Sequence, residues 1–292
     1  MNLQKYEIFL RVVEIGSLTA AAAELGCTQS AVSHALASLE EELGFRLVRR
    51  GRGGIRPTNE GESMLPAARA LLRAVEGLEQ TAAGIRGLKT GTVRIGTFTS
   101  VSVHWLPGMI KSYRERYPGV DFRIMSGDYH DVRQWLTDGS VDLGFVALPC
   151  EAPCRYIPLA DDRMMAVIPQ NHRFAGLPRF PLAMAADEAF ISLLETSDQD
   201  LRRALDAAGV APTIDLQTKD DYAIIAMVEN GLGISVMPEL LLRGRSENVI
   251  TMELAPPAIR TIALAIPSHA EPGPAAAAFI DCAVQWVKEK GL

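Results

Sequence analysis

The sequence has few of the features that mark secreted, membrane-spanning or disulfide-stapled proteins. Only 4 of its 292 residues are cysteine, and they are scattered at Cys27, Cys150, Cys154 and Cys282. No apolar run approaches the roughly 18 residues that a membrane helix needs. The first residues also lack the basic segment and apolar core of an export signal. We therefore expect no disulfide scaffold, no transmembrane helix and a cytoplasmic location.

An excess of positive charge is also missing. The formal net charge is −6, whereas a protein that coats nucleic acid is expected to be basic overall. Any contact with DNA must therefore come from a local basic patch, and most of the chain must serve another purpose. Hydrophobic residues make up 48% of the sequence, and a length of 292 residues allows two or three domains with real cores.

Signatures of the common catalytic and cofactor-binding classes are absent from the sequence. It contains no G-x-S-x-G elbow, Walker loop, H-E-x-x-H pair or G-x-G-x-x-G after a strand. The histidines lack the spacing of metal ligands and lie at His34, His104, His130, His172 and His269. We therefore expect neither an enzyme nor a cofactor or metal site. Catalysis stays an alternative that turnover of a small molecule by the purified protein would support.

The first sixty residues have the pattern of a helix-turn-helix. Apolar residues recur at helical spacing over residues 3–13, Gly16 ends that helix, and Ser17 is placed to cap the next one. An alanine-rich second helix over 19–25 is followed by a short turn and a third helix over 29–43. Two short helices joined by a glycine-containing turn are typical of DNA-binding helix-turn-helix domains.

The helix over 29–43 has two faces of different character. One face carries an apolar stripe at intervals of three and four, which predicts burial. The stripe consists of Val32, Leu36, Leu39 and Leu43. The opposite face has small and polar side chains, which would let the helix lie close in a major groove and bond phosphates or base edges. The predicted DNA-binding residues here are Thr28, Gln29, Ser30, Ser33 and His34. An ordinary solvated helix face is the alternative.

A loop rich in glycine and arginine follows this helix. Five arginines fall between positions 46 and 56 and are interrupted by Gly51, Gly53 and Gly54. Arginines on the tip of a hairpin can reach phosphates or a minor groove. A solvated loop is the alternative, but the position directly after a candidate recognition helix in an acidic chain favours DNA. The predicted DNA-binding residues of this wing are Arg49, Arg50, Arg52 and Arg56.

Over residues 9–61 the sequence resembles the LysR-type transcriptional regulators. FLRVVEIGSLTAAA at 9–22 is similar to the opening of that family's DNA-binding domain, QSAVSH at 29–34 to its recognition helix, and RPTNEG at 56–61 to its wing and the following helix. Ser30 and Val48 stand where the family most often has proline and phenylalanine. The resemblance implies a winged helix-turn-helix over residues 1–58 that binds double-stranded DNA. RNA polymerase is a further expected partner.

Residues 59–88 have the pattern of one long linker helix, which Thr58 or Asn59 can cap. Apolar residues alternate three and four positions apart, as in a helix that packs along another helix in a coiled coil. This seam runs through Ala68, Leu71, Val75, Leu78, Ala82 and Ile85, and Pro66 lies near its start. Packing on its own domain is the alternative. The resemblance implies a homodimer formed through this helix, and assembly into a tetramer.

Strand and helix patterns alternate over residues 91–292, which is typical of α/β domains with parallel sheets. Two such units follow one another, and we expect lobe I over 91–162 and 267–292 and lobe II over 163–266. DLG at 142–144 and GLGI at 231–234 are similar to stretches of the LysR effector domain. That domain resembles periplasmic binding proteins and holds a small-molecule effector between its lobes. The predicted fold class is an all-α winged helix-turn-helix, a linker helix and a two-lobed α/β effector domain.

In open parallel sheets, ligands bind beyond the carboxyl ends of the strands. Polar or small residues follow the predicted strands of lobe I or open the helices of lobe II. Residues 97–100 open a helix after the first strand, so their hydroxyls and backbone N–H groups can face an anionic or polar ligand. The predicted effector-binding residues are Thr97, Phe98, Thr99, Ser100, Ser126, Gly127, Asp128, Ala147, Leu148, Ser197 and Asp220. Tyr129, His130 and the rest of Thr218–Asp221 are further candidates. For each residue alone, an ordinary helix cap is the alternative.

Two other functions remain open from the sequence. Cys150 and Cys154 lie four positions apart, each directly after a proline, and could form a redox pair, which would make the chain a redox-responsive regulator. The two lobes would also suit a solute-binding protein, although the missing export signal and the N-terminal segment speak against it. We expect instead an effector that binds two subunit arrangements with different affinity and thereby shifts their populations.

Overall fold

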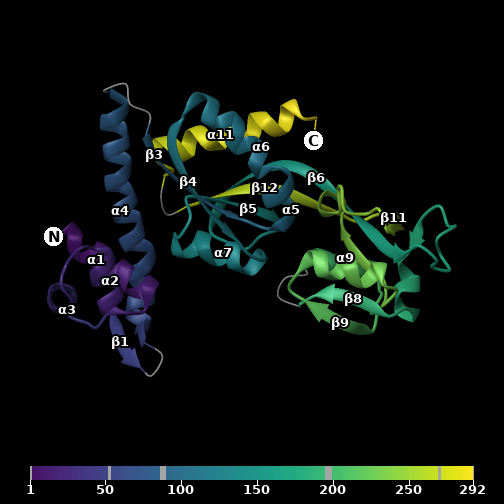
Figure 1. Cartoon of the computed structure of the whole chain (residues 1–292), viewed down its shortest axis with the longest axis horizontal. Coiled ribbons are helices and arrows are strands. Elements are labelled where there is room, and N and C mark those ends of the chain that lie inside the picture. The colour runs from purple at the N-terminus through teal and green to yellow at the C-terminus, as the bar shows by residue number, and fades with distance from the viewer. Residues whose placement is uncertain (1, 52–53, 86–89, 195–198, 269–270, 292) are drawn as a thin grey trace.

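The computed structural model describes residues 2–51, 54–85, 90–194, 199–268 and 271–291. Arg52 and Ser197, two of the predicted site residues, lie outside these ranges. Along the chain, the described residues form a small helical domain, one long helix and a two-lobed α/β domain (Figure 1). None of the helices in these ranges has the length and apolarity that crossing a membrane requires.

The N-terminal domain consists of three helices and a β-hairpin. They are α1 (Leu3–Ile15), α2 (Leu18–Glu24), α3 (Gln29–Leu43) and the antiparallel strands β1 (Val48–Gly51) and β2 (Gly54–Pro57). Side-chain caps start the helices: Ser17 Oγ accepts from Ala20 N at 3.3 Å, and Thr28 Oγ1 accepts from Ala31 N at 3.2 Å. The predicted apolar stripe of α3 faces the domain core, where Val32, Leu36 and Leu39 are buried.

A buried carboxylate on α3 holds the start of the wing. Glu40 is 8% exposed, and its Oε1 accepts hydrogen bonds from the backbone N–H groups of Leu47 at 2.8 Å and Val48 at 3.2 Å. A buried carboxylate is tolerated when its oxygens are bonded in this way. The position of the wing relative to the candidate recognition helix is therefore set by that helix itself.

The long helix α4 (Asn59–Ile85) begins directly after Thr58, whose hydroxyl caps its first turn. Its first half belongs to the N-terminal domain, where Ala68 is buried in the core. Its second half exposes the predicted seam, with Leu78 70% and Ile85 83% exposed. The alternative of packing within the same chain thus holds for the first half of the helix. It holds in part for the second half, where Ala83 is buried and Gln80 Oε1 accepts from Ala275 N at 3.2 Å. The exposed seam residues lie where a second copy of the chain can reach them.

Lobe I is a sheet with helices on both faces (Figure 1). Strands β3 (Thr90–Thr97), β4 (Gly119–Ser126) and β5 (Leu143–Leu148) are parallel, and β12 (Ile259–Pro267) runs antiparallel to β5. One face packs against α5 (Thr99–His104), α6 (Leu106–Arg116) and α11 (Pro274–Glu289), and the other against α7 (Tyr129–Asp138). Tyr113 and Phe279 are fully buried on the first face, and Val132 and Leu136 on the second.

Lobe II contains shorter elements. They are β7 (Phe180–Pro181), the 3-10 helix η1 (Leu182–Asp187), β8 (Phe190–Leu193), α8 (Gln199–Ala208), β9 (Ile214–Thr218), α9 (Asp221–Glu229), β10 (Ser235–Pro238), α10 (Glu239–Leu242) and β11 (Val249–Ala255). Strands β10 and β11 both pair antiparallel with the second half of β6 (Cys154–Pro169), and β8 pairs in parallel with β9. Phe180 and Phe190 are fully buried in the core of this lobe.

Two strands run from one lobe into the other, and their pairing defines the boundary between the lobes. β6 pairs with β12 as far as Arg163 and then enters lobe II, in agreement with the predicted break at residue 163. β12 pairs with β5 from Thr261 to Ala265, so the chain returns to lobe I near Ile259 and not at residue 267. The predicted second boundary was wrong because an apolar strand carries no sign of the sheet that it joins. The two-lobed α/β architecture itself was predicted correctly.

Candidate effector cavity and DNA-binding surface

A cavity of about 320 Å³ lies between the two lobes. Lobe I contributes the residues that follow β3 and β4 and the start of α7, and lobe II contributes the starts of α8 and α9. The lining residues are Phe98, Thr99, Ser100, Ser126, Gly127, Asp128, Tyr129, Asp131, Met164, Leu193, Asp200, Lys219, Asp221, Pro238, Leu241 and Arg260. Helix starts from both lobes therefore converge on one small volume.

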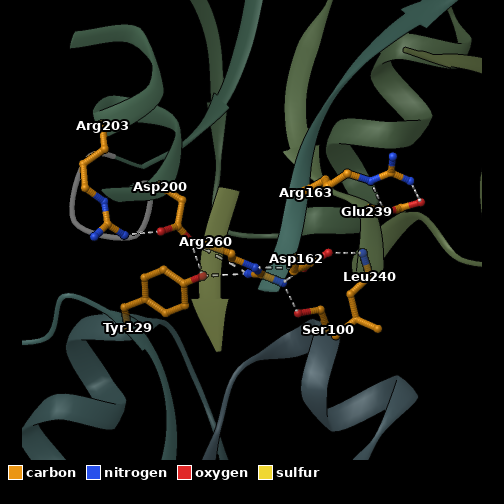
Figure 2. Close-up of polar contacts among 9 residues, drawn as sticks. All are labelled: Ser100, Tyr129, Asp162, Arg163, Asp200, Arg203, Glu239, Leu240 and Arg260. Carbon is orange, nitrogen blue, oxygen red and sulfur yellow. Dashed lines mark hydrogen bonds and ion pairs between the residues drawn. The ribbon is translucent and has the colours of Figure 1, made fainter. Parts of the chain in front are cut away.

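Arg260, which is 4% exposed, is a buried charge at the junction of the lobes (Figure 2). Its guanidinium donates to Asp162 Oδ2 from Nε at 2.9 Å and from Nη2 at 2.7 Å. Nη2 also donates to Ser100 Oγ at 2.7 Å. Nη1 donates to Tyr129 OH at 2.7 Å and lies 3.9 Å from Asp200 Oδ2. Side chains from α5, α7, α8 and β6 are thereby held around one guanidinium group.

The surroundings of Arg260 keep it charged. Burial alone would lower its pKa, but Tyr129, Asp162 and Asp200 raise that pKa above its usual value. Burial raises the pKa of the Tyr129 hydroxyl, which stays protonated and donates to Asp200 Oδ2 at 2.5 Å. The Phe98 ring centroid lies 5.2 Å from Arg260 Cζ, within cation–π range. Arg260 is thus nearly saturated with partners, so it organises the cavity wall and has little capacity left for an anionic ligand.

Asp221, in the first turn of α9, has a sparser environment. Burial raises its pKa, and a hydrogen bond with Thr99 of lobe I opposes that shift. No ion pair involving Asp221 occurs within the described ranges. Four aspartates line the cavity, against the two cations Lys219 and Arg260. The wall therefore carries an excess of negative charge.

The starts of α7 and α9 are capped by their own side chains. Asp128 Oδ1 accepts from Asp131 N at 2.9 Å, and Asp131 Oδ2 accepts from Asp128 N at 3.1 Å. In α9, Asp220 Oδ1 accepts from Tyr222 N at 2.9 Å. Free backbone N–H groups at a helix start can attract an anionic ligand. Carboxylates occupy these positions instead, which removes the attraction of a helix start for an anion.

The structure places six of the predicted effector residues in the cavity wall: Phe98, Thr99, Ser100, Ser126, Gly127 and Asp128. Four others lie elsewhere. Thr97 is fully buried and donates to the neighbouring carbonyl oxygen at 3.3 Å. Ala147 lines a different cavity, Leu148 offers its carbonyl oxygen to Arg203 at 2.9 Å, and Asp220 caps α9. The first three were chosen because they end a strand, but successive side chains of a strand point to opposite faces. Asp220 was chosen because it opens a helix, and its carboxylate is used by the cap of that helix. Effector binding by the six lining residues stays a prediction.

Three charged residues of the junction, Arg260, Asp162 and Asp200, were not predicted as site residues. The signal that could have revealed them is Arg260, which lies two positions before the apolar stretch 262–266. A charge inside a buried strand must be paired, because an unpaired buried charge is strongly destabilising. Its partner Asp162 lies 98 positions away in the sequence, so the pairing itself could not be located without the fold.

Most of the predicted DNA-binding residues lie at the surface of the N-terminal domain. The exposed ones are Thr28, Gln29, Ser30 and His34 around the start of α3 and Arg49, Arg50 and Arg56 on the wing, while Ser33 is half-buried. Arg49 and Arg56 are opposite one another across the hairpin, so their side chains share one of its faces. The hairpin therefore carries a local cationic surface in an otherwise acidic chain.

The candidate redox pair consists of free thiols. Cys150 and Cys154 are both half-buried, and burial raises the pKa of the Cys154 thiol to about 11. A reactive cysteine needs a lowered pKa, because the thiolate is the species that reacts. The environment of Cys154 therefore disfavours a redox role at neutral pH.

Comparisons with known proteins assign both parts of the chain. Residues 3–62 match the model for bacterial regulatory helix-turn-helix proteins of the lysR family, and residues 86–288 match the LysR substrate binding domain. The uncharacterized HTH-type transcriptional regulator YvbU of Bacillus subtilis is 32% identical, over 97% of this chain and 98% of its own. A probable hydrogen peroxide-inducible genes activator of Mycobacterium leprae is 30% identical, over 79% of this chain and 76% of its own.

The fold has a similar counterpart among solved structures. A full-length OxyR variant from Pseudomonas aeruginosa superposes with a TM-score of 0.80 at 23% identity, over 99% of this chain and 95% of that chain. The match of residues 3–62 to a DNA-binding domain also counts against the alternative of a solute-binding protein. The fold and the two family matches together show that the chain is a DNA-binding transcription regulator of the LysR family.

Proposed function

We propose that this regulator senses a small molecule held between its two lobes and changes its binding to operator DNA in response. The observation that carries the proposal is the cavity whose wall joins α5 and α7 of lobe I to α8 of lobe II around Arg260. A ligand at such a junction contacts both lobes, so its affinity depends on how the lobes are arranged. In this proposal the ligand is bound and released unchanged, and no cofactor takes part.

The cavity wall favours a small neutral or cationic effector over a strong anion. Its aspartates outnumber its cations, and Arg260 already bonds to Asp162, Ser100 and Tyr129. Asp221 retains acceptor capacity beside the Thr99 hydroxyl. An amine or hydroxyl group of the effector would satisfy Asp221, whereas a carboxylate there would meet like charge.

Helix α7 connects this cavity to the linker helix. Its first residues line the cavity, and carbonyl oxygens at its end accept hydrogen bonds from α4. Arg69 Nη1 donates to Asp138 O at 2.9 Å, and Arg73 Nη1 donates to Gly139 O at 2.5 Å. A ligand that shifts α7 would therefore displace α4 through these hydrogen bonds. The first turns of α4 are part of the N-terminal core. This gives the cavity a continuous physical route to the DNA-binding domain.

The DNA-binding half of the proposal assigns α3 to the major groove and the wing arginines to phosphates or the minor groove. If two copies of the chain pair through the exposed seam of α4, at Leu78 and Ile85, the dimer has two DNA-binding domains. Half-sites about one helical turn apart, or a multiple of it, would then be expected. Because the target is genomic DNA, the proposed place of action is the cytoplasm.

The proposal is tested by measuring binding of the full chain to the DNA upstream of its own gene and to a scrambled duplex at the same salt. A panel of small cationic, neutral and anionic compounds is then screened for a change in that binding. Asp221→Asn should lose the response to a cationic effector while DNA affinity without effector stays the same. Asp215→Asn, an exposed site on β9, is the matched control. A response unaffected by Asp221→Asn would contradict the assignment of the cavity, and equal binding to both duplexes would contradict operator recognition.

A further inference from the structure

A second cavity, of about 300 Å³, lies next to the first, and Tyr129 lines both. Its walls come from α7 and the segment after β5 in lobe I and from α8 in lobe II. Tyr129 donates to Asp200 at 2.5 Å, and Asp200 in turn pairs with Arg203 (Figure 2). Arg203 lines the second cavity but not the first. These three side chains form the partition between the two cavities.

The second cavity has the opposite charge character to the first. Arg133 from α7 and Arg202 and Arg203 from α8 line it, against the acidic residues Glu151 and Asp206. Arginine presents a planar fork of donors that matches a carboxylate or phosphate. Three arginines from two lobes, against two acidic residues, therefore make this cavity suited to an anion.

Arg133 is the guanidinium with most capacity for a ligand. Arg203 is already bonded to Asp200 and donates to the carbonyl oxygen of Leu148 at 2.9 Å. In the described part of the chain, by contrast, Arg133 pairs with no carboxylate, and its Nη2 lies 3.3 Å from His130 Nδ1. A positive charge without a counter-charge beside a cavity is the feature that an anionic ligand would satisfy.

The remaining wall of this cavity is partly apolar, with Val146, Ala147 and Pro149. A ligand that suits the whole cavity has an anionic head and a small apolar body. We propose that this cavity is a second ligand site, for a small organic carboxylate, with Arg133 as its anchor. The bound carboxylate would join α7 to α8 across the lobe junction.

The partition couples this site to the first cavity. A carboxylate beside α8 competes with Asp200 for Arg203, and Asp200 also accepts from Tyr129 in the wall of the first cavity. A change in the bonds of Asp200 therefore alters the walls of both cavities. By linkage, each ligand changes the equilibrium affinity of the other by the same factor.

The test is calorimetric titration of the full chain with cyclohexanecarboxylate at constant ionic strength, with cyclohexylmethanol as the neutral analogue. Saturable binding is expected for the carboxylate and not for the alcohol. Arg133→Gln should weaken carboxylate binding about tenfold or more, because a charge-assisted pair is lost. Arg116→Gln, an exposed arginine at the end of α6, should leave binding unchanged. The thermal midpoint of each variant checks that it is folded.

Lys219→Gln separates this site from the first cavity, whose wall Lys219 shares with Asp221. Full binding in Lys219→Gln with loss in Arg133→Gln supports the second site. Loss in Lys219→Gln with full binding in Arg133→Gln would put the carboxylate in the first cavity and overturn the proposal. Equal binding by all variants, or no saturable binding, would overturn it too. A carboxylate in the first cavity would also contradict the preference proposed there for a neutral or cationic effector. The other failures leave the proposed function untouched, because that function is read from the response of DNA binding.

Discussion

The wing and the lobe junction use the same side chain in opposite ways. Arg49, Arg50 and Arg56 are exposed on a small hairpin, whereas Arg260 is 4% exposed and bonded to Asp162, Ser100 and Tyr129. An exposed guanidinium contributes little to stability and is available to neutralise a phosphate. A buried one must be paired or it destabilises the fold. The wing arginines should therefore control affinity for a partner, and Arg260 should control the arrangement of the lobes.

The largest effect of a substitution is expected at the lobe junction, on the free energy of unfolding. Asp162→Ala leaves Arg260 buried without its main carboxylate and also removes the acceptor of Leu240 N, bonded at 2.9 Å. We expect the free energy of unfolding to fall by about 3–5 kcal/mol, measured by urea denaturation of the full chain. The double variant Asp162→Leu/Arg260→Met should recover a large part of this loss, because it leaves no unpaired charge.

A neighbouring arginine supplies the control for that measurement. Arg163 pairs with Glu239 close to Arg260 (Figure 2). It also pairs with Glu253, and its side chain is 54% exposed. Arg163→Ala should change the free energy of unfolding only slightly, because solvent screens its ion pairs. Similar losses in Arg163→Ala and Asp162→Ala would show that burial is not what distinguishes the two pairs.

The next largest effect is expected on α3. His34→Ala should reduce the preference for the upstream DNA over a scrambled duplex by about 1–3 kcal/mol, the usual value of a base contact. The exposed position of His34 predicts an unchanged free energy of unfolding. Fluorescence anisotropy with the two duplexes at one salt concentration measures the preference, and Glu41→Gln, also exposed on α3, is the control. Equal losses on both duplexes would mean that His34 does not face the bases.

A smaller and sequence-independent effect is expected on the wing. Arg49→Gln should weaken binding to both duplexes alike and reduce the slope of log affinity against log salt by about 0.9, the contribution of one phosphate contact. Its free energy of unfolding should stay that of the parent chain. Anisotropy titrations at several salt concentrations give the slope. An unchanged slope would remove Arg49 from the phosphate contacts.

The smallest effect concerns one thiol of the N-terminal domain and one of lobe I. Cys27 is exposed in the N-terminal domain, whereas burial raises the pKa of Cys154 to about 11. At pH 8 only about one Cys154 thiol in a thousand is then ionised, so iodoacetamide should modify Cys27 much faster. Mass spectrometry of peptides over time measures the two rates, and the Cys154 rate should rise with pH towards 11. Faster modification of Cys154 than of Cys27 at neutral pH would restore the redox alternative.

Local patterns predicted the N-terminal domain well because its helices carry their own start and stop signals. The third helix was expected over 29–43 and is found there, since Thr28 caps it and Gly44 ends it in the left-handed conformation. Lobe II was predicted less completely. No strand was predicted at β8, which has only four residues, or at β11, whose seven residues begin with two consecutive apolar residues instead of a clean alternation.

The candidate cavity was predictable only where its residues are defined by local structure. Thr99, Ser126 and Asp128 follow strands of lobe I, and that position alone suggested them. The cluster around Arg260 depends on pairing between Asp162 and a strand that returns 98 positions later. Such contacts come from the order of strands in the sheet, which no local pattern encodes.

The link between α7 and the linker helix consists largely of bonds to backbone oxygens. Arg69 and Arg73 donate to the carbonyl oxygens of Asp138 and Gly139, and every amino acid supplies a carbonyl. Substitutions near the start of α7 can therefore alter which molecule the chain recognises without dismantling this connection. During evolution, descendants of this regulator could come to recognise a new effector through substitutions at the start of α7. The end of the same helix would stay bonded to α4 and so remain connected to the same DNA-binding domain.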